Sequence, residues 1–393
     1  MADAVGRGVM SKATIRSVET VPLRSTLDEP FGYAQAWVEE RTALLVRIET
    51  DDGTVGWGEC WGPIAGTREI VTDLLAPIVE GRDPTAVEQL YREMYDAGRT
   101  AYQSIVPLPA ISGVDLALWD LRGKLAGESV ASLLGGRRRE DVRAYATGHY
   151  FKHDAPLAEQ YDRIAAEAKA NADRLGAVKA KIGLSFLGYG PDEDVELVRR
   201  IREAVGEDVP LMVDANYAYD AATARRVGRA IEDFDVYWFE EPVPPEDHDG
   251  YAALRQALDV RVAGGECHTP AELADLLGDG ALDVVQPDVC NVGGITAADG
   301  IATQAQANGI PVVPHVWGTP VAIAASLQLI ATLEGQTSPW LEFDNSSNPL
   351  REDLGVGSFD VSEDGRVSVP EGPGLGVEID EDAFERYRIE EPS

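Results

Sequence analysis

Short apolar runs alternate with amphipathic helical segments from about residue 143 onward, and this alternation limits the fold more than any other feature of the chain. Strands that alternate with helices in this way predict a parallel (β/α) barrel. The eight strand-like runs are residues 144–145, 177–182, 210–214, 237–240, 262–265, 284–287, 312–315 and 340–343. Their span, about 143–345, is short for eight complete units, so we expect at least one helix to be missing or shortened.

The first third of the chain has a different pattern. Residues 15–23, 42–49 and 55–60 read as strands, and the turn Asp51-Asp52-Gly53 predicts a hairpin between the last two. Residues 67–126 carry apolar side chains at helical spacing, and Gly135-Gly136 marks a boundary. The predicted organisation is an α+β domain at 12–136, the barrel at 140–345, and a C-terminal segment at 346–393 that packs back on the first domain and includes a strand at 377–379.

The charge balance excludes several classes of partner. The chain has 34 Lys and Arg against 68 Asp and Glu, a net charge of −34, which repels nucleic acid and anionic membrane surfaces. Only six of the cationic residues are lysines. An acidic surface with few lysines suits concentrated salt, where ions screen the self-repulsion of the fold. We therefore hypothesise a halophilic source, in which each retained lysine needs a reason.

The cysteines and the apolar runs indicate the compartment. Cys60, Cys267 and Cys290 are far apart and form no CxxC pair, so the sequence predicts neither a disulfide framework nor a zinc site. The N-terminal residues lack the apolar stretch of a signal peptide, and no apolar run is long enough to span a bilayer. The expected location is the cytoplasm.

Three carboxylates close three consecutive strand-like runs. They are Asp214, Glu240 and Glu266, which follow one another at intervals of 26 residues, about one βα unit each. Barrel enzymes carry their catalytic groups at the C-terminal ends of the strands, so the three side chains are expected to converge there. An oxygen-only ligand set suits a hard divalent cation, and the predicted cofactor is Mg²⁺. Such an ion can hold a substrate carboxylate and stabilise the dianion formed when its α-proton leaves.

Four further strand ends carry candidate acid, base and hydrogen-bonding groups. Lys179 and Lys181 lie two residues apart, so both point to the same side of their strand. A lysine beside a metal ion and a second ammonium can have a lowered pKa and act as a general base. Asp288 and His315 close consecutive runs, so the carboxylate can orient the imidazole as a second acid or base. Glu342 closes the last run and is a candidate hydrogen-bond partner of the enediolate.

Four other residues are candidates for contact with substrate. Asn216 follows Asp214, and His149 lies just past the first run. Tyr33 and Trp61 belong to aromatic loops of the first domain, where they are expected either to cover the barrel mouth or to pack in the core.

The chain resembles the enolase superfamily, specifically its mandelate racemase subgroup. The resemblance rests on the segments VKAKIG, VDAN, FEEP, GGE, QPD, PHVWGT and LEFD and covers nearly the whole chain. It implies an α/β fold, a (β/α)7β TIM-type barrel with an N-terminal α+β capping domain. It also implies Mg²⁺ on Asp214, Glu240 and Glu266, with Lys181 as the base on one face of the substrate α-carbon and the Asp288–His315 dyad on the other.

The subgroup catalyses more than one reaction. The segments PHVWGT, WLEFDNSSNPLR and PEGPGLGVEI are similar to those of the galactarolactone cycloisomerase and acid-sugar dehydratase families. The resemblance therefore implies a lyase or isomerase that takes the α-proton of a sugar acid or its lactone and eliminates a β-oxygen to give a 3-deoxy-2-keto acid. The alternative is a racemase or epimerase of a 2-hydroxy acid. The expected partners are the small-molecule substrate and further copies of the chain, as a dimer or octamer.

Overall fold

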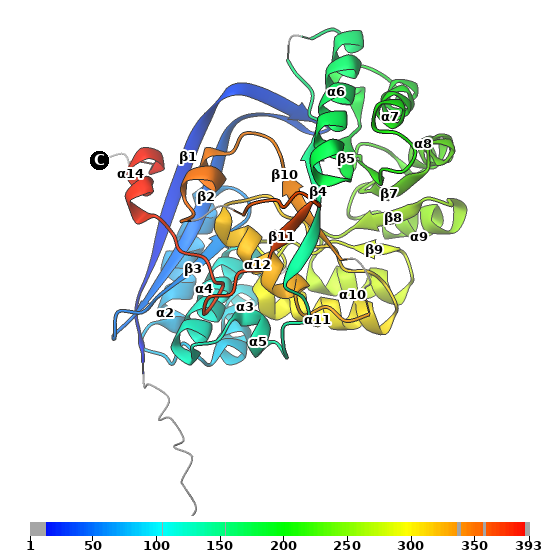
Figure 1. Ribbon diagram of the computed structural model, residues 1–393. Helices are drawn as coiled ribbons and strands as arrows, with labels where there is room; N and C mark the ends of the chain where they lie inside the picture. The colour runs from blue at the N-terminus through cyan, green and yellow to red at the C-terminus, as the bar shows by residue number, and fades with distance from the viewer. Residues whose placement is uncertain (1–12, 104, 154, 336–338, 357–358, 390–393) are drawn as a thin grey trace, which may run out of the picture.

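The computed structural model describes residues 13–103, 105–153, 155–335, 339–356 and 359–389 (Figure 1). Residue 12, where the first predicted domain begins, lies outside these ranges. The capping domain begins with a three-stranded antiparallel sheet and continues with helices. Its elements are β1 (Ile15–Tyr33), β2 (Ala36–Thr50), β3 (Val55–Cys60), α1 (Ile64–Glu69), the π-helical turn η1 (Ile70–Leu75), α2 (Ala76–Val79), α3 (Val87–Tyr102), α4 (Leu108–Ala126) and α5 (Val130–Leu133).

A curled parallel sheet with helices on its outer side forms the second region. Its strand order is β10-β4-β5-β6-β7-β8-β9, so β10, the last parallel strand along the chain, pairs with β4, the first. The strands are β4 (Asp141–Gly148), β5 (Val178–Lys181), β6 (Leu211–Asp214), β7 (Val236–Glu240), β8 (Arg261–Gly264), β9 (Val284–Val285) and β10 (Trp340–Asp344). The helices are α6 (Leu157–Leu175), α7 (Pro191–Val205), α8 (Ala221–Ile231), α9 (His248–Ala257), α10 (Pro270–Gly278), α11 (Gly294–Ala307) and α12 (Pro320–Ile330), with the short turns η2 (Leu184–Leu187) and η3 (Glu232–Phe234).

This sheet agrees with the predicted barrel in all but one run. Residues 312–315 were expected as a strand, yet they form only a single bridge, between Val312 and Val285. Pro311 and Pro314 flank the bridge, and because proline has no N–H it cannot donate to a sheet ladder. The expected shortened unit is the last one, since β10 is followed only by the five-residue helix α13 (Pro349–Asp353).

The C-terminal segment differs from its prediction. No strand forms at 377–379, and Ile379 makes only an isolated bridge to Gly355. The preceding glycines, Gly374 and Gly376, both have a φ of +72°, which turns the chain instead of extending it. The strand that does form is β11 (Arg366–Ser368), which pairs with β4. The chain then ends in η4 (Glu381–Ala383) and α14 (Phe384–Tyr387).

Two buried carboxylates join the capping domain to the barrel helices. Asp115 of α4 accepts hydrogen bonds from the backbone N–H (3.0 Å) and hydroxyl (2.6 Å) of Thr296 in the first turn of α11. Glu59 of β3 accepts from the N–H (3.1 Å) and hydroxyl (2.7 Å) of Thr319 and from the N–H of Ala322 (3.2 Å) at the start of α12. Carboxylates at helix N-termini satisfy free N–H groups and favour the helix dipole.

The long β1–β2 ribbon carries capping residues to one end of the barrel (Figure 1). Gly32, near the tip of the ribbon, exchanges backbone hydrogen bonds of 2.9 Å with Phe151, just beyond β4. The ribbon therefore reaches the end where the strands of the parallel sheet finish. Among the described helices, none combines the length and the apolar character that crossing a membrane requires.

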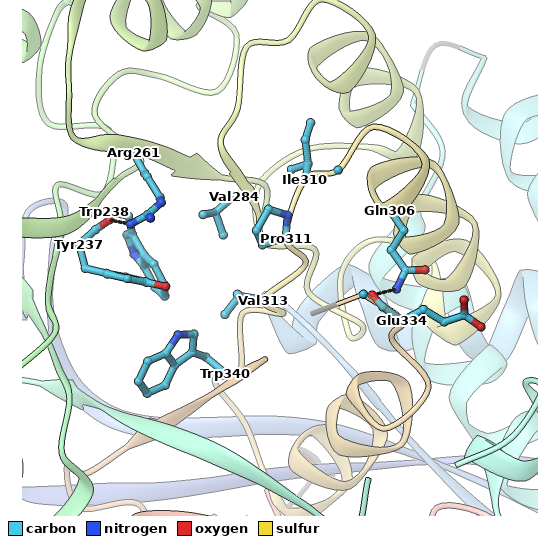
Figure 2. Close-up of a pocket in the computed structure, with 12 residues that line it drawn as sticks. Tyr237, Trp238, Arg261, Val284, Gln306, Ile310, Pro311, Val313, Glu334 and Trp340 are labelled. Atoms are coloured by element: carbon cyan, nitrogen blue, oxygen red, sulfur yellow. Dashed lines mark hydrogen bonds between the residues drawn. The ribbon is translucent and has the colours of Figure 1, made fainter. Parts of the chain in front are cut away.

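The opposite end of the barrel holds aromatic side chains. Figure 2 shows Trp340 and Tyr237 beside a cavity of about 340 Å³, with Val284 and Val313 on its wall. Trp340, Tyr237 and Val284 lie at the start of their strands, so the cavity lies at the N-terminal end of the sheet.

Candidate active site

A cavity of about 360 Å³ lies between the tip of the β1–β2 ribbon and the C-terminal ends of the parallel strands. Both regions of the chain contribute to it. Its lining includes Tyr33, Arg41 and Trp61 from the capping domain and Lys181, Asn216, Glu266, His315 and Trp317 from the barrel. Of the candidates named from the sequence, Tyr33, Trp61, Lys181, Asn216, Glu266 and His315 therefore share one cavity.

Lys179 and Lys181 both lie buried among carboxylates. The Nζ of Lys179 bonds to Glu240 and lies 2.7 Å from Oε1 of Glu342 and 3.8 Å from Oδ2 of Asp214. The Nζ of Lys181 lies 2.5 Å from the same Asp214 oxygen. The two ammonium groups thus stand side by side, as expected for residues two apart on one strand.

The lysine pKa values move in the direction opposite to that expected from the sequence. Burial disfavours both ammonium groups, but Asp214 offsets it for Lys181, and Glu240 with Glu342 offset it for Lys179, so both pKa values lie above the ordinary value. The expected lowering assumes a metal ion beside the lysines as well as the second ammonium. Among the described side chains, carboxylates outnumber cations around the pair, and the lowered pKa stays a prediction for the metal-bound site.

The three predicted metal ligands lie on neighbouring strands. Asp214 pairs with Glu240 in the ladder between β6 and β7, and Glu266 follows β8. Oε2 of Glu240 accepts hydrogen bonds from the indole of Trp238 (2.8 Å) and the amide of Gln286 (2.7 Å). Burial, together with the charges of Asp214, Glu342 and Glu266, raises the pKa of Glu240 to about 8. The raised pKa is the electrostatic cost of bringing these acids together.

The donor set fits a divalent cation. Glu241, which follows Glu240, is also buried, and burial with the charges of Glu266 and Asp214 raises its pKa well above the ordinary value. Oε1 of Glu241 and Oδ1 of Asn216 are buried without a hydrogen-bond partner among the described residues. Surplus carboxylates and unpaired oxygens are what a hard cation requires. Among the described residues, the ligand atoms that lie within 4.8 Å of one another are those of Glu241, Glu266 and Cys267, a group that includes Glu266 but neither Asp214 nor Glu240.

His315 and Asp288 form the expected dyad. Nδ1 of His315 lies 2.6 Å from Oδ2 of Asp288, and its Nε2 lies 3.3 Å from Oε2 of Glu266. Burial disfavours the imidazolium, but Glu266 and Asp288 outweigh it and raise the pKa of His315 to about 10. The indole of Trp61 stands edge-on to the imidazole, with ring centroids 5.3 Å apart. The capping domain therefore helps to hold the orientation of this ring.

His149 does not line the cavity, which corrects its assignment as a substrate contact. The side chain is fully buried, and its backbone has a φ of +62°. Its Nδ1 lies 2.8 Å from the backbone carbonyl of Lys179, and its Nε2 lies 3.1 Å from Nδ2 of Asn171. Because both ring nitrogens are engaged, His149 supports β5 from the side away from the substrate.

Sequence reasoning missed Arg41 and Trp317. Both line the cavity, and the Arg41 guanidinium lies over the Trp317 ring, 4.4 Å from its centroid. The residues to which Arg41 bonds are about 300 positions away in the sequence, so no local pattern marks it. Trp317 lies two residues after His315 within PHVWGT, but the motif does not single it out as a lining residue.

Comparisons with known families agree with this geometry. Residues 15–135 match the model of the mandelate racemase and muconate lactonizing enzyme N-terminal domain, and residues 163–383 match the enolase C-terminal domain-like model. The chain belongs to the enolase superfamily, in its mandelate racemase subgroup. Because its relatives include sugar-acid dehydratases and a cycloisomerase, the chain is an enzyme of the lyase or isomerase type.

Three of the proteins similar to this superfamily member carry names of known reactions. It is 41% identical over 389 residues to D-galactarolactone cycloisomerase of Agrobacterium fabrum, covering 96% of this chain and all of that one. The crystal structure of 3,6-anhydro-D-galactonate cycloisomerase of Zobellia galactanivorans has a TM-score of 0.85 at 36% identity, covering 96% of this chain and all of that one. A mutant L-talarate/galactarate dehydratase liganded with Mg and L-glucarate has a TM-score of 0.83 at 29% identity, covering 99% of this chain and 95% of that one.

Proposed function

We propose that this enzyme removes the α-proton of a sugar-acid carboxylate or its lactone and then eliminates a β-oxygen to give a 3-deoxy-2-keto acid, with Mg²⁺ bound by Asp214, Glu240 and Glu266. The observation that carries the proposal is the position of two proton-transfer groups on one cavity. Lys181 ends β5, and His315 follows β9, so the two groups enter the same cavity from strands that are separated by β6, β7 and β8. A substrate α-carbon between them meets a base on each face.

Each group has a supported role. Lys181 takes the α-proton on its face, and Lys179 holds positive charge beside the substrate carboxylate. Glu342, which accepts a hydrogen bond from the Val316 N–H (3.4 Å), lies next to Lys179 and orients it. On the opposite face, Asp288 fixes the tautomer and direction of His315, which donates a proton to a leaving hydroxyl. When bound at the three carboxylates, Mg²⁺ supplies positive charge that favours loss of the α-proton.

The relatives support elimination and leave two leaving groups open. A dehydratase expels a hydroxyl from a free acid, which requires a proton from a general acid such as His315. A cycloisomerase expels the ring oxygen of a lactone, which leaves as a carboxylate and needs no proton. The 41% identity to a D-galactarolactone cycloisomerase along the whole chain favours the lactone reaction.

Racemisation or epimerisation is the second candidate. It is favoured by the same two-sided arrangement of Lys181 and His315, because a proton removed on one face can be returned on the other. The two reactions differ in their products, since racemisation yields no keto acid.

The test is a screen of the purified enzyme with Mg²⁺ against hexarates, hexonates, pentonates and their 1,4-lactones, with 2-keto acid read as semicarbazone absorbance. We expect product with at least one lactone or free acid, and loss of product when EDTA removes the metal. Product from lactones alone identifies a cycloisomerase, and product from free acids identifies a dehydratase.

A screen without keto acid would contradict elimination. Deuterium uptake at the α-carbon of the same compounds in D₂O, with inversion, would then support the racemase. Two controls separate loss of the metal from loss of the fold. Activity should return when Mg²⁺ is added after EDTA, and titration calorimetry without substrate should show that Mg²⁺ binds.

A further inference from the structure

Arg41 is a buried cation at the edge of the active-site cavity, and its side chain is only 3% exposed. It belongs to β2, so it reaches the cavity from the capping domain. Its guanidinium carbon lies 4.4 Å from the centroid of the Trp317 ring and 5.0 Å from that of Phe31. Contacts of this kind with two aromatic rings fix the plane of the guanidinium.

Hydrogen bonds to the end of β10 and the segment after it use two of its three nitrogens. Nη2 lies 2.9 Å from Oδ2 of Asp344 and also bonds to the hydroxyl of Ser346. Nε donates to the backbone carbonyl of Ser347 at 3.2 Å. These bonds account for a structural role, the attachment of the β1–β2 ribbon to the end of β10.

The third nitrogen is not explained by that role. Nη1 is buried and has no hydrogen-bond partner among the described residues. A buried charged donor without an acceptor is unfavourable, and such a group calls for a partner such as a water, an ion or a ligand. Arg41 lines the cavity, and its guanidinium retains hydrogen-bonding capacity that its contacts with the described residues do not use.

The local charge balance indicates what kind of group completes it. The carboxylate of Asp344 is shared, since Nη1 of Arg351 lies 3.5 Å from the same oxygen that Arg41 binds. Arg351 also contacts Glu352 at 3.2 Å, but that carboxylate is half exposed and weakened by solvent. Glu40, which also lines the cavity, is exposed and pairs with Arg24 at 3.2 Å. The buried part of this cluster therefore has two guanidiniums for one carboxylate, which favours an anion.

We propose that Arg41 binds the carboxyl group remote from the reacting α-carbon, so that the substrate is a dicarboxylic sugar acid or its monolactone and not a monocarboxylic one. This inference rests on the proposed function, which places one substrate carboxylate beside Lys179 and Lys181. Arg41 lines the same cavity as Lys181, and the cavity is of a size that holds a small ligand. The second carboxyl group then meets Arg41.

The lactone reaction gives this cation a further role. The α-C–H bond breaks and its proton passes to the base, its electron pair forms the new double bond, and the bond from the β-carbon to the ring oxygen breaks. The ring oxygen keeps that bonding pair, so the lactone carbonyl becomes a second carboxylate. Arg41, fixed beside Trp317 and Phe31, is placed to neutralise the charge that forms there.

The test compares substrates that differ only at the remote end. D-Galactarate is compared with D-galactonate, and galactaro-1,4-lactone with 3,6-anhydro-D-galactonate, whose ring oxygen is an ether. We expect the wild type to prefer the dicarboxylic member by at least about 100-fold in kcat/KM. Arg41→Gln should remove most of that preference by lowering kcat/KM for the dicarboxylic member alone. Arg41→Lys, which keeps the charge but loses the planar fork, should lie between the two.

The exposed Arg24 on β1 provides the matched control, and Arg24→Gln should leave kcat/KM within about twofold. A wild type that uses both members of each pair equally would overturn the inference even if Arg41→Gln fails to fold. Equal losses on both members in a folded Arg41→Gln variant would do so as well.

A binding measurement distinguishes failure of this inference from failure of the proposed function. If no compound is turned over, calorimetric titration of Lys181→Ala with D-galactarate and D-galactonate gives the same comparison. At least tenfold tighter binding of galactarate, lost on adding Arg41→Gln, would support the role of Arg41, and equal binding would overturn it.

Discussion

The two ends of the barrel are built from the same strands but carry opposite chemistry. On β7, Trp238 precedes Glu240 by two residues, and on β10, Trp340 precedes Glu342 by two. Residues two apart lie on one face of a strand, so each pair points into the barrel at different heights. The N-terminal height is an aromatic and aliphatic cluster beside the cavity of Figure 2, and the C-terminal height holds the charged groups. Two residues along a strand thus separate a side chain of the aromatic cluster from a side chain of the charged site.

The largest effect is expected at the charged end. Lys181→Ala and His315→Asn should each lower kcat by about 10³-fold, because each removes a proton-transfer group. Steady-state kinetics with the substrate found by the keto-acid screen measures the loss. Lys169→Ala in α6 and His248→Asn at the start of α9 remove the same residue types outside the site and should keep full activity. Full activity in both site variants would contradict the assigned bases.

The opposite result is expected at the aromatic end. Trp340→Ala removes a side chain that is 5% exposed and packs against Tyr145 and Tyr237, with ring centroids 6.3 Å apart in both pairs. Loss of a buried tryptophan should lower the free energy of unfolding by about 3 to 5 kcal/mol. Urea unfolding measures it, while kcat of the folded fraction should change by less than about threefold. A large loss of kcat with unchanged stability would break the proposed division between the two ends.

The charged end was easier to predict from the sequence than the segments around it. Carboxylates that close successive apolar runs can be read from spacing alone, because parallel strands bring their C-terminal ends together. Residues 312–315 look apolar enough for a strand, yet Pro311 and Pro314 leave it without the N–H groups for a ladder. His149 follows a strand-like run, but only its contacts with the Lys179 carbonyl and Asn171 show that its ring is held within the fold instead of lining the cavity.

Contacts between the two domains were beyond the reach of local patterns. Arg41 bonds to Asp344, 303 positions later, and Glu59 bonds to Thr319, 260 positions later. Asp344 lies in the segment LEFD and Thr319 in PHVWGT, but neither segment indicates which residue of the capping domain it contacts. Glu241 directly follows a predicted metal ligand, but spacing reveals neither its φ of +40° nor that its Oε1 has no hydrogen-bond partner among the described residues.

Glu59 is a buried acid of the capping domain, and its hydrogen bonds go to the start of α12. It therefore tests how burial changes the titration of a carboxyl group. Burial, only partly offset by the hydrogen bonds from Thr319 and Ala322, raises the pKa of Glu59 to about 7. The folded protein thus binds a proton more tightly than the unfolded chain, so stability is present at low pH and falls as pH rises from about 4.5 to about 7. The rise in pKa corresponds to about 3 kcal/mol.

Glu59→Gln should remove that dependence, since the neutral amide still accepts from the Thr319 N–H and the threonine hydroxyl can reverse its bond. Urea unfolding of wild type and variant at pH 5, 6, 7 and 8 gives the difference in slope. Asp115, which caps α11 and whose pKa also rises to about 7 through burial, allows an independent repeat with Asp115→Asn. Parallel curves for wild type and both variants would show that these carboxyls do not titrate in this range.

The smallest effect per group is expected at the surface, where the net charge of −34 contrasts with the paired charges inside the barrel. Potassium chloride at molar concentration shortens the Debye length to about 3 Å, which screens exposed carboxylates from one another but scarcely affects buried pairs. Thermal unfolding in 2 M KCl should therefore occur at least about 2 °C higher than in 0.1 M KCl. Sucrose of equal osmolality, which acts by exclusion from the surface, should give a smaller rise. Equal Tm values at the two salt concentrations would contradict the halophilic hypothesis, because a surface adapted to salt gains its stability from that screening.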